Sequence, residues 1–555
     1  MAETILIVAH AHPELSPGGA EIVAYRLFEE LRRQRDRTVH FLAATDDPTS
    51  VGPRAAFSAF RGREDETLFF SNAIDNFVFS QKSQTAINAF AQVLERIKPG
   101  IIHFHHYFNI GLEFYSTAHR LLPNTKLLLT LHEYHAICAH WGLMVKTDSA
   151  ALCDRATPED CSSCFPNRAP TEFAERNRFI NLHLDHVDMF VAPSRFLRDR
   201  YIAWGIAPER IIVIENGTAT IEPPPARTLR RGERRSVFGF FGQINPFKGL
   251  VPLLAAFEQL REHPAQRAGD LRLVVNGAYL ELNDPAYIAT VRRLFDRTSP
   301  QTRFAGPYRH SDLSRLMAEI DWVVVPSVWW ENAPLVIEEA LAHRRPVICS
   351  NIGGMAEKVS EGRDGLHFPA GDPVALAETL LHAAEETDLW DRLRQSMRSP
   401  PTTDRFLAEH LQLYQQIGGR MRGDDTAVPD QATGSTAALS ATEHLLTGRL
   451  RIVDLARGLH RLDIAGLVSA DTASTEAADP AIHICILPGG KGGDALLSSD
   501  GSSGHDVWLG SAGGVVFAAS YSDASRVLVT AYEGPPGGRA EAPQVATQRI
   551  ADAPA

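Results

Sequence analysis

Residues 323–340 read VVVPSVWWENAPLVIEEA, and the order of residue types along this stretch indicates a strand, a loop and a helix. The valines form a short apolar run typical of a buried strand, and Pro334 suits the first turn of a helix. Glu331 lies in the loop, and Glu339 follows Pro334 by just over one helical turn. We expect both carboxylates at the carboxyl end of a strand, where open α/β sheets bind ligands. They can accept hydrogen bonds from two sugar hydroxyl groups. Alternatively, one charge favours the helix dipole and Glu338 is its solvated neighbour.

A glycine-rich loop earlier in the chain carries a second signal, at Phe241-Gly-Gln-Ile-Asn-Pro-Phe-Lys-Gly-Leu250. A hydrophobic strand ends in Gly242, the chain turns, and Lys248 stands beside another glycine at the start of a helix. Glycine lets the backbone approach a phosphate, a helix N-terminus offers unbonded N–H groups, and lysine adds a positive charge. The pattern predicts a diphosphate-binding loop. The alternative is a tight turn with a solvated lysine.

Strands and helices alternate along most of the chain. Residues 4–9 form an apolar strand, a turn-rich segment follows, and residues 20–31 have a helical pattern. The alternation continues to about residue 214 and begins again at Ser236, after the Pro- and Arg-rich stretch 222–235. Such a pattern predicts mostly parallel sheets covered by helices on both faces. We therefore expect two tandem α/β domains.

The predicted domain boundaries follow from where the alternation of strands and helices stops and where the composition of the chain changes. The N-terminal domain spans residues 1–221, with a cysteine-containing insertion at about 133–170, and the second α/β domain spans 236–400. A helix over 401–420 is expected to return to the N-terminal domain. The remaining predictions are a linker over 421–440, a small β domain of sandwich type over 441–533, and a disordered tail over 534–555.

Composition restricts the class of protein. Hydrophobic residues make up 44% and charged residues 22% of the 555, which is ordinary for a soluble globular chain. The net charge of −12 argues against a nucleic-acid binder, because such proteins usually present a basic surface. The sequence has no stretch near the ~18 apolar residues that cross a bilayer. Residues 1–10 lack the basic residues and long apolar run of a signal peptide, so we expect a cytoplasmic protein.

Together these motifs identify a family. The sequence resembles the retaining glycosyltransferases of family 4, which have the two-domain GT-B fold. The resemblance runs from about residue 4 to residue 418, and the order and spacing of its pieces are more specific than any single piece. The matching pieces are Gly18-Gly19-Ala20-Glu21, Thr130-Leu-His132-Glu133, Pro193-Ser-Arg-Phe196, Glu215-Asn-Gly217, Gly242 with Lys248-Gly249, Asp321 to Ser327, Glu331 with Glu339, and Ile352-Gly-Gly354.

The resemblance implies roles for individual residues in two Rossmann-like domains that face a cleft. Lys248 would bind the diphosphate of a nucleotide sugar, Glu339 the ribose, and Glu331 the hydroxyls of the donor sugar. His132 matches the cleft histidine that contacts the sugar near the reacting carbon, so His132, Lys248 and Glu331 are the implied catalytic residues. The implied donor-binding set is Gly18, Gly19, Gly242, Gln243, Lys248, Glu331, Asn332, Ala333, Pro334, Leu335 and Glu339.

One position departs from the family pattern. The family commonly has arginine directly after the glycine that Gly242 matches, and this chain has Gln243. One of the two charges that neutralise the diphosphate is thus missing, and Lys248 is expected to act with backbone N–H groups and another cation. Family members let the leaving phosphate assist deprotonation of the acceptor and usually require no metal, so no catalytic cofactor is expected.

Other residues are candidates for the acceptor side and for membrane contact. His105 and His106 follow a strand, and this position makes contact with an acceptor plausible, although a histidine at a strand end is more often structural. The basic run Arg227–Arg235 can touch an anionic membrane surface from the cytoplasmic side, with a solvated linker as the alternative. Trp329 and Trp330 either line the donor pocket or pack in the core.

Four cysteines fall within the insertion of the first domain. A closing Cys-x-x-Cys pair and two earlier thiols can supply the four ligands of a tetrahedral structural zinc site. The alternative is four reduced cysteines or redox pairing. The four residues are Cys138, Cys153, Cys161 and Cys164.

Three functional hypotheses follow. The first is a glycosyltransferase that moves a sugar from a UDP- or GDP-sugar to a glycan or lipid-linked acceptor in surface polysaccharide or glycoconjugate biosynthesis. The second is a non-catalytic nucleotide- or glycan-binding protein on the same scaffold, which Gln243 and the appended β segment motivate. The third is a GT-B phosphorylase or synthase that acts on sugar phosphates.

Overall fold

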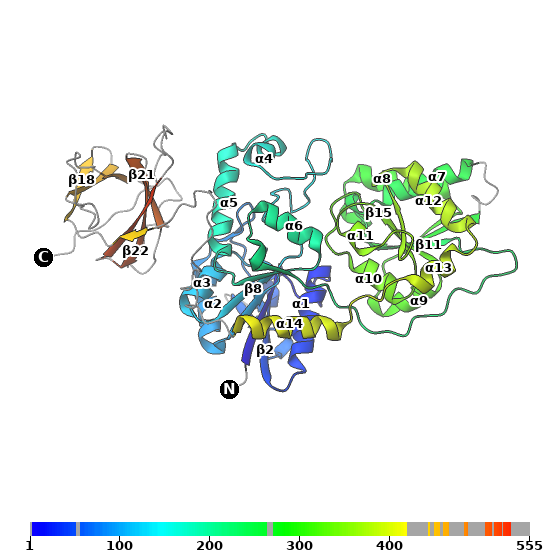
Figure 1. Ribbon diagram of the computed structural model, residues 1–555, viewed down its shortest axis with the longest axis horizontal. Coiled ribbons are helices and arrows are strands. Elements are labelled where there is room, and N and C mark those ends of the chain that lie inside the picture. Colours follow the sequence, from blue (N-terminus) through cyan, green and yellow to red (C-terminus); the bar gives the residue numbers. More distant parts are fainter. Residues whose placement is uncertain are drawn as a thin grey trace, which may run out of the picture. The chain divides into compact units, whose positions relative to one another are not determined.

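The computed structural model describes residues 3–51, 56–263 and 270–418, and the backbone of several strands between 442 and 533. The chain forms two compact units, Met1–Ala427 and Val428–Ala555. The first unit contains two α/β domains, each built on its own sheet (Figure 1). No helix in the described part of the chain is both long and apolar enough to span a membrane.

The N-terminal domain has an eight-stranded sheet in the order β10-β9-β8-β7-β1-β2-β4-β3. Its strands pair in parallel except β3, which runs antiparallel to β4. The strands are β1 (Glu3–Ala9), β2 (Arg37–Ala44), β3 (Phe57–Ala59), β4 (Glu66–Phe69), β7 (Ile101–Phe104), β8 (Lys126–Thr130), β9 (Met189–Ala192) and β10 (Ile211–Val213), and a separate hairpin pairs β5 (Ile74–Asp75) with β6 (Ser80–Gln81).

Helices cover both faces of this sheet, as a parallel sheet requires. Four helices pack on one face: α2 (Gln84–Ile97), α3 (Glu113–Leu121), α5 (Pro170–Leu184) and α6 (Arg195–Trp204). Two pack on the other: α1 (Gly19–Arg32) and α14 (Thr403–Gly418). The short helix α4 (Pro158–Cys164) lies in the cysteine-containing insertion and packs against α5.

The second domain has a six-stranded, fully parallel sheet in the order β13-β12-β11-β14-β15-β16. Its strands are β11 (Val237–Gln243), β12 (Arg272–Ala278), β13 (Thr302–Gly306), β14 (Trp322–Val325), β15 (Val347–Ser350) and β16 (Gly365–Phe368). Its helices are α7 (Leu250–Glu262), α8 (Pro285–Thr298), α9 (Leu313–Ala318), α10 (Leu335–Ala342), α11 (Gly353–Lys358), α12 (Pro373–Glu385) and α13 (Leu389–Ser396). The expectation of two α/β domains with parallel sheets is confirmed.

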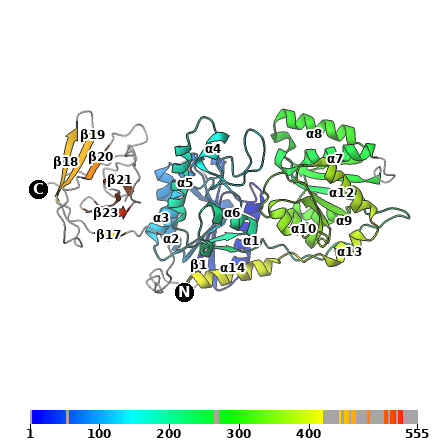
Figure 2. The same ribbon diagram turned by 45° about the horizontal axis from the view of Figure 1, so that its top comes forward.

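The last helix of the first unit belongs in space to its first domain. After the second domain the chain returns as α14, which packs beside α1 (Figure 2). Phe406 and Tyr414 of α14 are buried in the same core as residues of β1 and β2. The Tyr414 hydroxyl lies 2.7 Å from Nδ1 of His103 on β7. The N-terminal domain is therefore completed by a segment almost 200 residues beyond its last strand.

The second unit contains antiparallel strands. β17 (Thr442–His444), β21 (Asp506–Ala512), β22 (Val515–Asp523) and β23 (Arg526–Glu533) form one sheet. β18 (Arg449–Leu455), β19 (Leu459–Ala465) and β20 (Ile482–Ile486) form another. The sandwich stays a prediction. The expected linker over 421–440 and tail over 534–555 lie outside the described residues.

Candidate functional site

A buried carboxylate and a lysine form the centre of the second domain's loop region. Glu331 follows β14 and is only 5% exposed. Its Oε1 accepts hydrogen bonds from the Lys248 ammonium at 2.7 Å, the Ser327 hydroxyl at 2.7 Å and the Trp329 indole N–H at 2.9 Å. Burial favours the neutral carboxyl, but the charge of Lys248 and the hydrogen bonds from Lys248, Ser327 and Trp329 together outweigh it and lower the pKa of Glu331. The site thus holds a carboxylate–ammonium pair, and Trp329 lines it.

Two glycines give the lysine loop its shape. Gly242, at the end of β11, has φ +133°, and Gly249 before α7 has φ +74°, which is the left-handed region that favours glycine. A Cβ on Gly249 would lie 1.8 Å from the carbonyl oxygen of Pro326. The lysine loop and the loop after β14 therefore touch through backbone, and this contact brings Lys248 to Glu331. Gln243 is exposed beside them.

The N-termini of two helices meet near this pair. Gly18 caps α1 and Gly19 begins it, while Pro334 caps α10 and Leu335 begins it. A Cβ on Gly19 would lie 3.7 Å from Cδ1 of Leu335, so the first turns of these helices are neighbours. Helix N-termini carry partial positive charge and unbonded N–H groups, which bind anions. The structure thus brings together the first-domain glycines and the α10 loop.

Asn332 connects the two domains. Its Oδ1 accepts a 2.7 Å hydrogen bond from the Ser194 hydroxyl, and its Nδ2 donates to the carbonyl oxygen of His132 at 3.1 Å. The neighbouring helix α11 adds another contact, because the Glu357 carboxylate accepts from the backbone N–H groups of Arg195 and Phe196 at 2.9 and 2.7 Å. Glu357 therefore caps the first turn of α6 from the opposite domain.

Glu339 lies one turn into α10, beside a cavity of about 210 Å³. Arg26 of α1 and His310 also line the cavity, and His310 Nδ1 is 3.5 Å from the Glu339 carboxylate. Burial raises the pKa of Glu339, and the nearby His310 and Arg26 oppose that shift. Sequence reasoning missed both neighbours, because they come from segments far from Glu339 in the chain.

The expectation that Glu338 lies in solvent is wrong. Glu338 is not a solvated neighbour of Glu339, because it is 2% exposed and lies 2.9 Å from the guanidinium of Arg398. Lys358 lies 3.7 Å from the same carboxylate. The basic run in the interdomain segment is likewise not fully solvated: Arg227 and Arg235 bond to the buried Asp321 at 2.8 and 3.2 Å.

His132 follows β8 and lies in a group of neutral histidines. Its Nε2 is 3.1 Å from His105 Nδ1, and burial lowers the pKa of His132 to about 3. Burial also lowers the pKa of His105 well below its ordinary value, and that of His106 to about 4. These imidazoles therefore act at neutral pH as hydrogen-bonding groups and not as cations. Contact of His105 or His106 with an acceptor stays a prediction.

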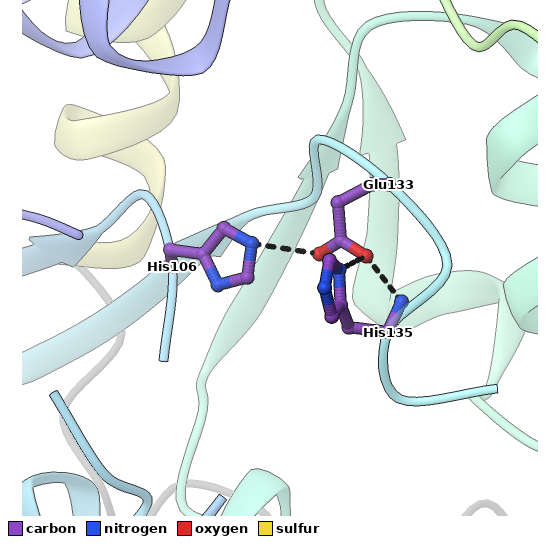
Figure 3. A group of neighbouring side chains, drawn as sticks. All are labelled: His106, Glu133 and His135. Carbon is purple, nitrogen blue, oxygen red and sulfur yellow. Dashed lines mark hydrogen bonds and ion pairs between the residues drawn. The ribbon is translucent and has the colours of Figure 1, made fainter. Parts of the chain in front are cut away.

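His106, Glu133 and His135 form the one set of three side chains, among the residues described, whose ligand atoms lie within 4.8 Å of one another (Figure 3). The Glu133 carboxylate lies between the two imidazoles. His106 Nδ1 accepts from the backbone N–H groups of Tyr107 and Phe108 at 3.0 and 2.8 Å. Because Nδ1 is an acceptor, the neutral ring carries its proton on Nε2. That proton occupies the lone pair a metal would need, so the arrangement is a hydrogen-bond network.

The four cysteines of the insertion are free thiols and half-buried. Burial raises the pKa of Cys161 to about 12, with smaller contributions from Cys138, Cys153 and Cys164 nearby. Within the described part of the chain, no three of the sulfurs share the 4.8 Å spacing of a metal site. Cys349, on β15, is fully buried in the core as expected.

Zinc binding by the four insertion cysteines stays a prediction, and the zinc content of the purified protein tests it. Thiolates bound to zinc lie ~2.3 Å from the metal, so coordination would draw the four sulfurs together. We expect elemental analysis of protein purified without chelator to give one zinc per chain. The double change Cys161→Ser and Cys164→Ser should release it. Metal-free protein with all four thiols titratable would reject the prediction.

Comparison with known proteins matches both α/β domains. A family model described as Glycosyltransferase Family 4 matches residues 17–221, and one described as Glycosyl transferases group 1 matches residues 235–386. A D-inositol 3-phosphate glycosyltransferase of Corynebacterium efficiens is 30% identical over 265 residues, which are 45% of this chain and 61% of that protein. A glycogen synthase of Mycobacterium tuberculosis is 31% identical over 197 residues, 35% of this chain and 44% of that protein. The matches thus span about half the length of these relatives.

Solved structures show the same fold. A sucrose-phosphate synthase from Thermosynechococcus elongatus superposes with a TM-score of 0.54 at 19% identity, covering 75% of this chain and 99% of that one. Anabaena HepE in complex with UDP superposes with a TM-score of 0.52 at 17% identity, covering 74% and 100%. Two family models on consecutive α/β domains, in the order that the sequence motifs require, confirm the resemblance. The chain belongs to the family 4 glycosyltransferases and has their GT-B fold.

Proposed function

We propose that the chain transfers a hexose from a nucleotide-sugar donor to a hydroxyl group of an acceptor, with retention of anomeric configuration. The observation that carries this proposal is the pair of half-buried Lys248 and buried Glu331, beside the N-termini of α1 and α10. A nucleotide sugar combines a diphosphate with a hydroxyl-bearing ring, and these two chemistries match a cation with N–H groups and a carboxylate. The crystallised HepE relative in complex with UDP supports a nucleotide ligand.

The reaction needs stabilisation of a leaving diphosphate and of a sugar that becomes cation-like. Lys248 and the helix N-termini are fixed in place, so they supply preorganised positive potential to the leaving group. Glu331 accepts donor hydroxyls and keeps negative charge near the sugar. Glu339 is assigned to the ribose, and the neutral His132 to a hydrogen bond near the reacting carbon. No step in this scheme requires a metal ion.

The second cation that Gln243 fails to supply has a candidate in Arg26. Its guanidinium is near enough to Glu339 to influence the titration of that carboxylate, and it bonds to the carbonyl oxygen of Gly217. It comes from α1, whose N-terminus lies beside that of α10. We assign Arg26 to the nucleotide end of the cleft, because it shares the Glu339 cavity.

For the acceptor we propose a glycan or lipid-linked saccharide in surface polysaccharide or glycoconjugate biosynthesis, handled by a cytoplasmic enzyme that contacts the membrane only peripherally. Two relatives are named a D-inositol 3-phosphate glycosyltransferase and a glycogen synthase, and these names support a hydroxyl-bearing acceptor. The alternative is a non-catalytic nucleotide- or glycan-binding protein, and Gln243 is the observation that favours it.

A donor panel separates these functions. The protein is incubated with UDP-, GDP- and ADP-hexoses, and released nucleoside diphosphate is measured together with the ligand-induced shift in melting temperature. We expect one nucleotide class to raise the melting temperature and its sugar conjugate to be hydrolysed slowly. A thermal shift with neither hydrolysis nor transfer to added saccharides would favour the binding protein. Neither shift nor hydrolysis would refute both functions.

A further inference from the structure

The network of His106, Glu133 and His135 leaves one imidazole nitrogen available to a ligand (Figure 3). Glu133 Oε1 lies 2.9 Å from His106 Nε2, which donates the proton that its tautomer places there. The other carboxylate oxygen accepts from both the backbone N–H and Nδ1 of His135. The two histidines hold the pKa of Glu133 well below its usual range, against the effect of burial. Nδ1 of His135 meets the Glu133 carboxylate, so Nε2 is the ring nitrogen left for a ligand.

The loop that carries His135 is held rigidly. Arg176 of α5 is 1% exposed, and its guanidinium donates to the carbonyl oxygens of His135 and Ala136, and to Phe77 at 2.7 Å. The Tyr201 hydroxyl donates to the carbonyl oxygen of Glu133 at 3.0 Å. A buried arginine that bonds to loop carbonyls fixes the backbone on both sides of the imidazole. Such support is what a preorganised binding residue needs.

A glycine closes over the pair. Gly142 has φ +67°, and a Cβ there would lie 2.7 Å from the Glu133 carboxylate and 2.8 Å from His135 Nδ1. Glycine at this position therefore lets the chain return across the Glu133–His135 hydrogen bond and shield it from water. Shielding strengthens a charged hydrogen bond, because the local dielectric constant falls. The imidazole is thus held in one orientation.

An exposed indole lies on the same loop as this imidazole, and both rings contact Phe108. Trp141 precedes Gly142, has φ +51° and is 59% exposed. Its ring lies edge-on to Phe108 at 6.4 Å between centroids, and Phe108 lies 5.5 Å from the His135 ring. An exposed tryptophan on a fixed loop offers a large apolar face that folding alone does not use. A sugar or cyclitol ring presents C–H groups on its face and hydroxyls at its edge, which suits an indole next to an imidazole acceptor.

The loop also lies at the boundary between the domains. It begins directly after His132, whose carbonyl oxygen is bonded to Asn332 of the second domain. We propose that His135 and Trp141 form the subsite for the acceptor: the indole stacks on the ring of a saccharide or cyclitol, and His135 Nε2 accepts a hydrogen bond from one of its hydroxyls. Glu133 and His106 are positioning residues, since they act through His135. This inference rests on the proposed glycosyl transfer.

Saturation-transfer NMR tests the subsite without knowledge of the natural acceptor. The full chain is mixed with UDP, GDP and ADP, and then with glucose, mannose, N-acetylglucosamine and myo-inositol as probes. We expect transfer to the ring protons of at least one probe. Trp141→Ala should abolish this signal and His135→Ala should reduce it at least fivefold, while His135→Gln, which keeps an acceptor oxygen, retains part of it. The nucleotide signal should stay unchanged in all three variants.

Controls separate the subsite from the donor function. Leu182→Ala removes another exposed apolar side chain, 50% exposed on α5, and should leave both signals intact. Nucleotide signals without any saccharide signal, or saccharide signals that the His135 and Trp141 changes leave untouched, would overturn the subsite alone. Absence of every nucleotide signal from the wild-type protein would instead overturn the proposed function on which the subsite rests.

Discussion

We expect Lys248→Ala to lower donor turnover by about 100- to 1,000-fold, the usual effect of removing one preorganised donor to a developing anion. Lys248 carries the positive charge of the lysine loop. Because Gln243 stands where the family commonly has arginine, no second charge at that position helps to neutralise the diphosphate. The measurement is the release of nucleoside diphosphate from the donor that the panel identifies. Lys82→Ala removes an exposed lysine of the first domain and serves as the control, with unchanged turnover.

A second change distinguishes catalysis from folding. Removing Lys248 leaves the Glu331 carboxylate buried without its cation, and this costs stability. Adding Glu331→Gln removes the buried charge, so the double variant should recover most of the melting temperature of the wild-type protein but not its activity. If the double variant regained turnover together with stability, Lys248 would have a structural role only. If Lys248→Ala alone were fully active, the donor assignment would be wrong.

The parts of this site that could be predicted are those that lie within one contiguous motif. The strand expected at the valines before Glu331 is β14 at Trp322–Val325, and α10 begins one residue after Pro334. Both follow from short-range physics: an apolar run forms a buried strand, and proline starts a helix. The contact between Lys248 and Glu331 follows from the same logic, because the carboxyl ends of β11 and β14 are adjacent in a parallel sheet.

The parts that could not be predicted depend on contacts between distant segments. β3 and β4 have three and four residues, too few for a periodic pattern to stand out. Glu338 was expected in solvent because a single helix face cannot reveal that Arg398, from a later loop, packs on it. The bond between Asn332 and His132 joins residues 200 positions apart, and no local signal encodes it.

The hydrogen-bond network around Glu133 could be predicted from the sequence only in part. Glu133 was visible as part of the family piece Thr130-Leu-His132-Glu133, but nothing in the sequence linked it to His106 or His135. The tautomer of His106 could not be predicted from the sequence, because two backbone N–H groups of the turn after β7 fix it. Only the folded turn shows that this group is a hydrogen-bond network and that Nε2 of His135 is the nitrogen left for a ligand.

The second large effect that we expect is a steep loss of stability in mild acid. Burial lowers the pKa of several histidines well below the ordinary value of 6.5, so these rings are neutral in the folded protein. The unfolded chain binds protons at these positions once the pH falls below 6.5, whereas the folded chain does not. Stability therefore rises with pH through this window and is lost as the pH falls. The residues are His103, His105, His106, His132, His183 and His410.

The size of the effect follows from proton linkage. Each ring contributes roughly 1 kcal/mol between pH 7 and pH 5.5, so the six together contribute several kcal/mol, comparable with the 5–15 kcal/mol that holds a typical domain folded. Carboxylates with lowered pKa values, such as Glu331, lose their contribution only below about pH 4.5, so they do not account for a loss that begins above pH 6. The histidines therefore set where the loss begins.

Melting temperatures measured from pH 7.5 to pH 4.5 test this linkage, with His410→Gln as the informative variant. His410 is buried on α14, away from the residues assigned to the donor. Its replacement should remove one proton from the linkage and reduce the pH slope of the unfolding free energy by about 1.4 kcal/mol per pH unit. Leu182→Ala, which removes an exposed side chain without a titratable group, is the control and should leave the slope unchanged. A melting temperature constant between pH 7.5 and pH 5 would contradict the neutral state of these rings. It would also remove the basis for treating His132 as an uncharged partner of the donor sugar.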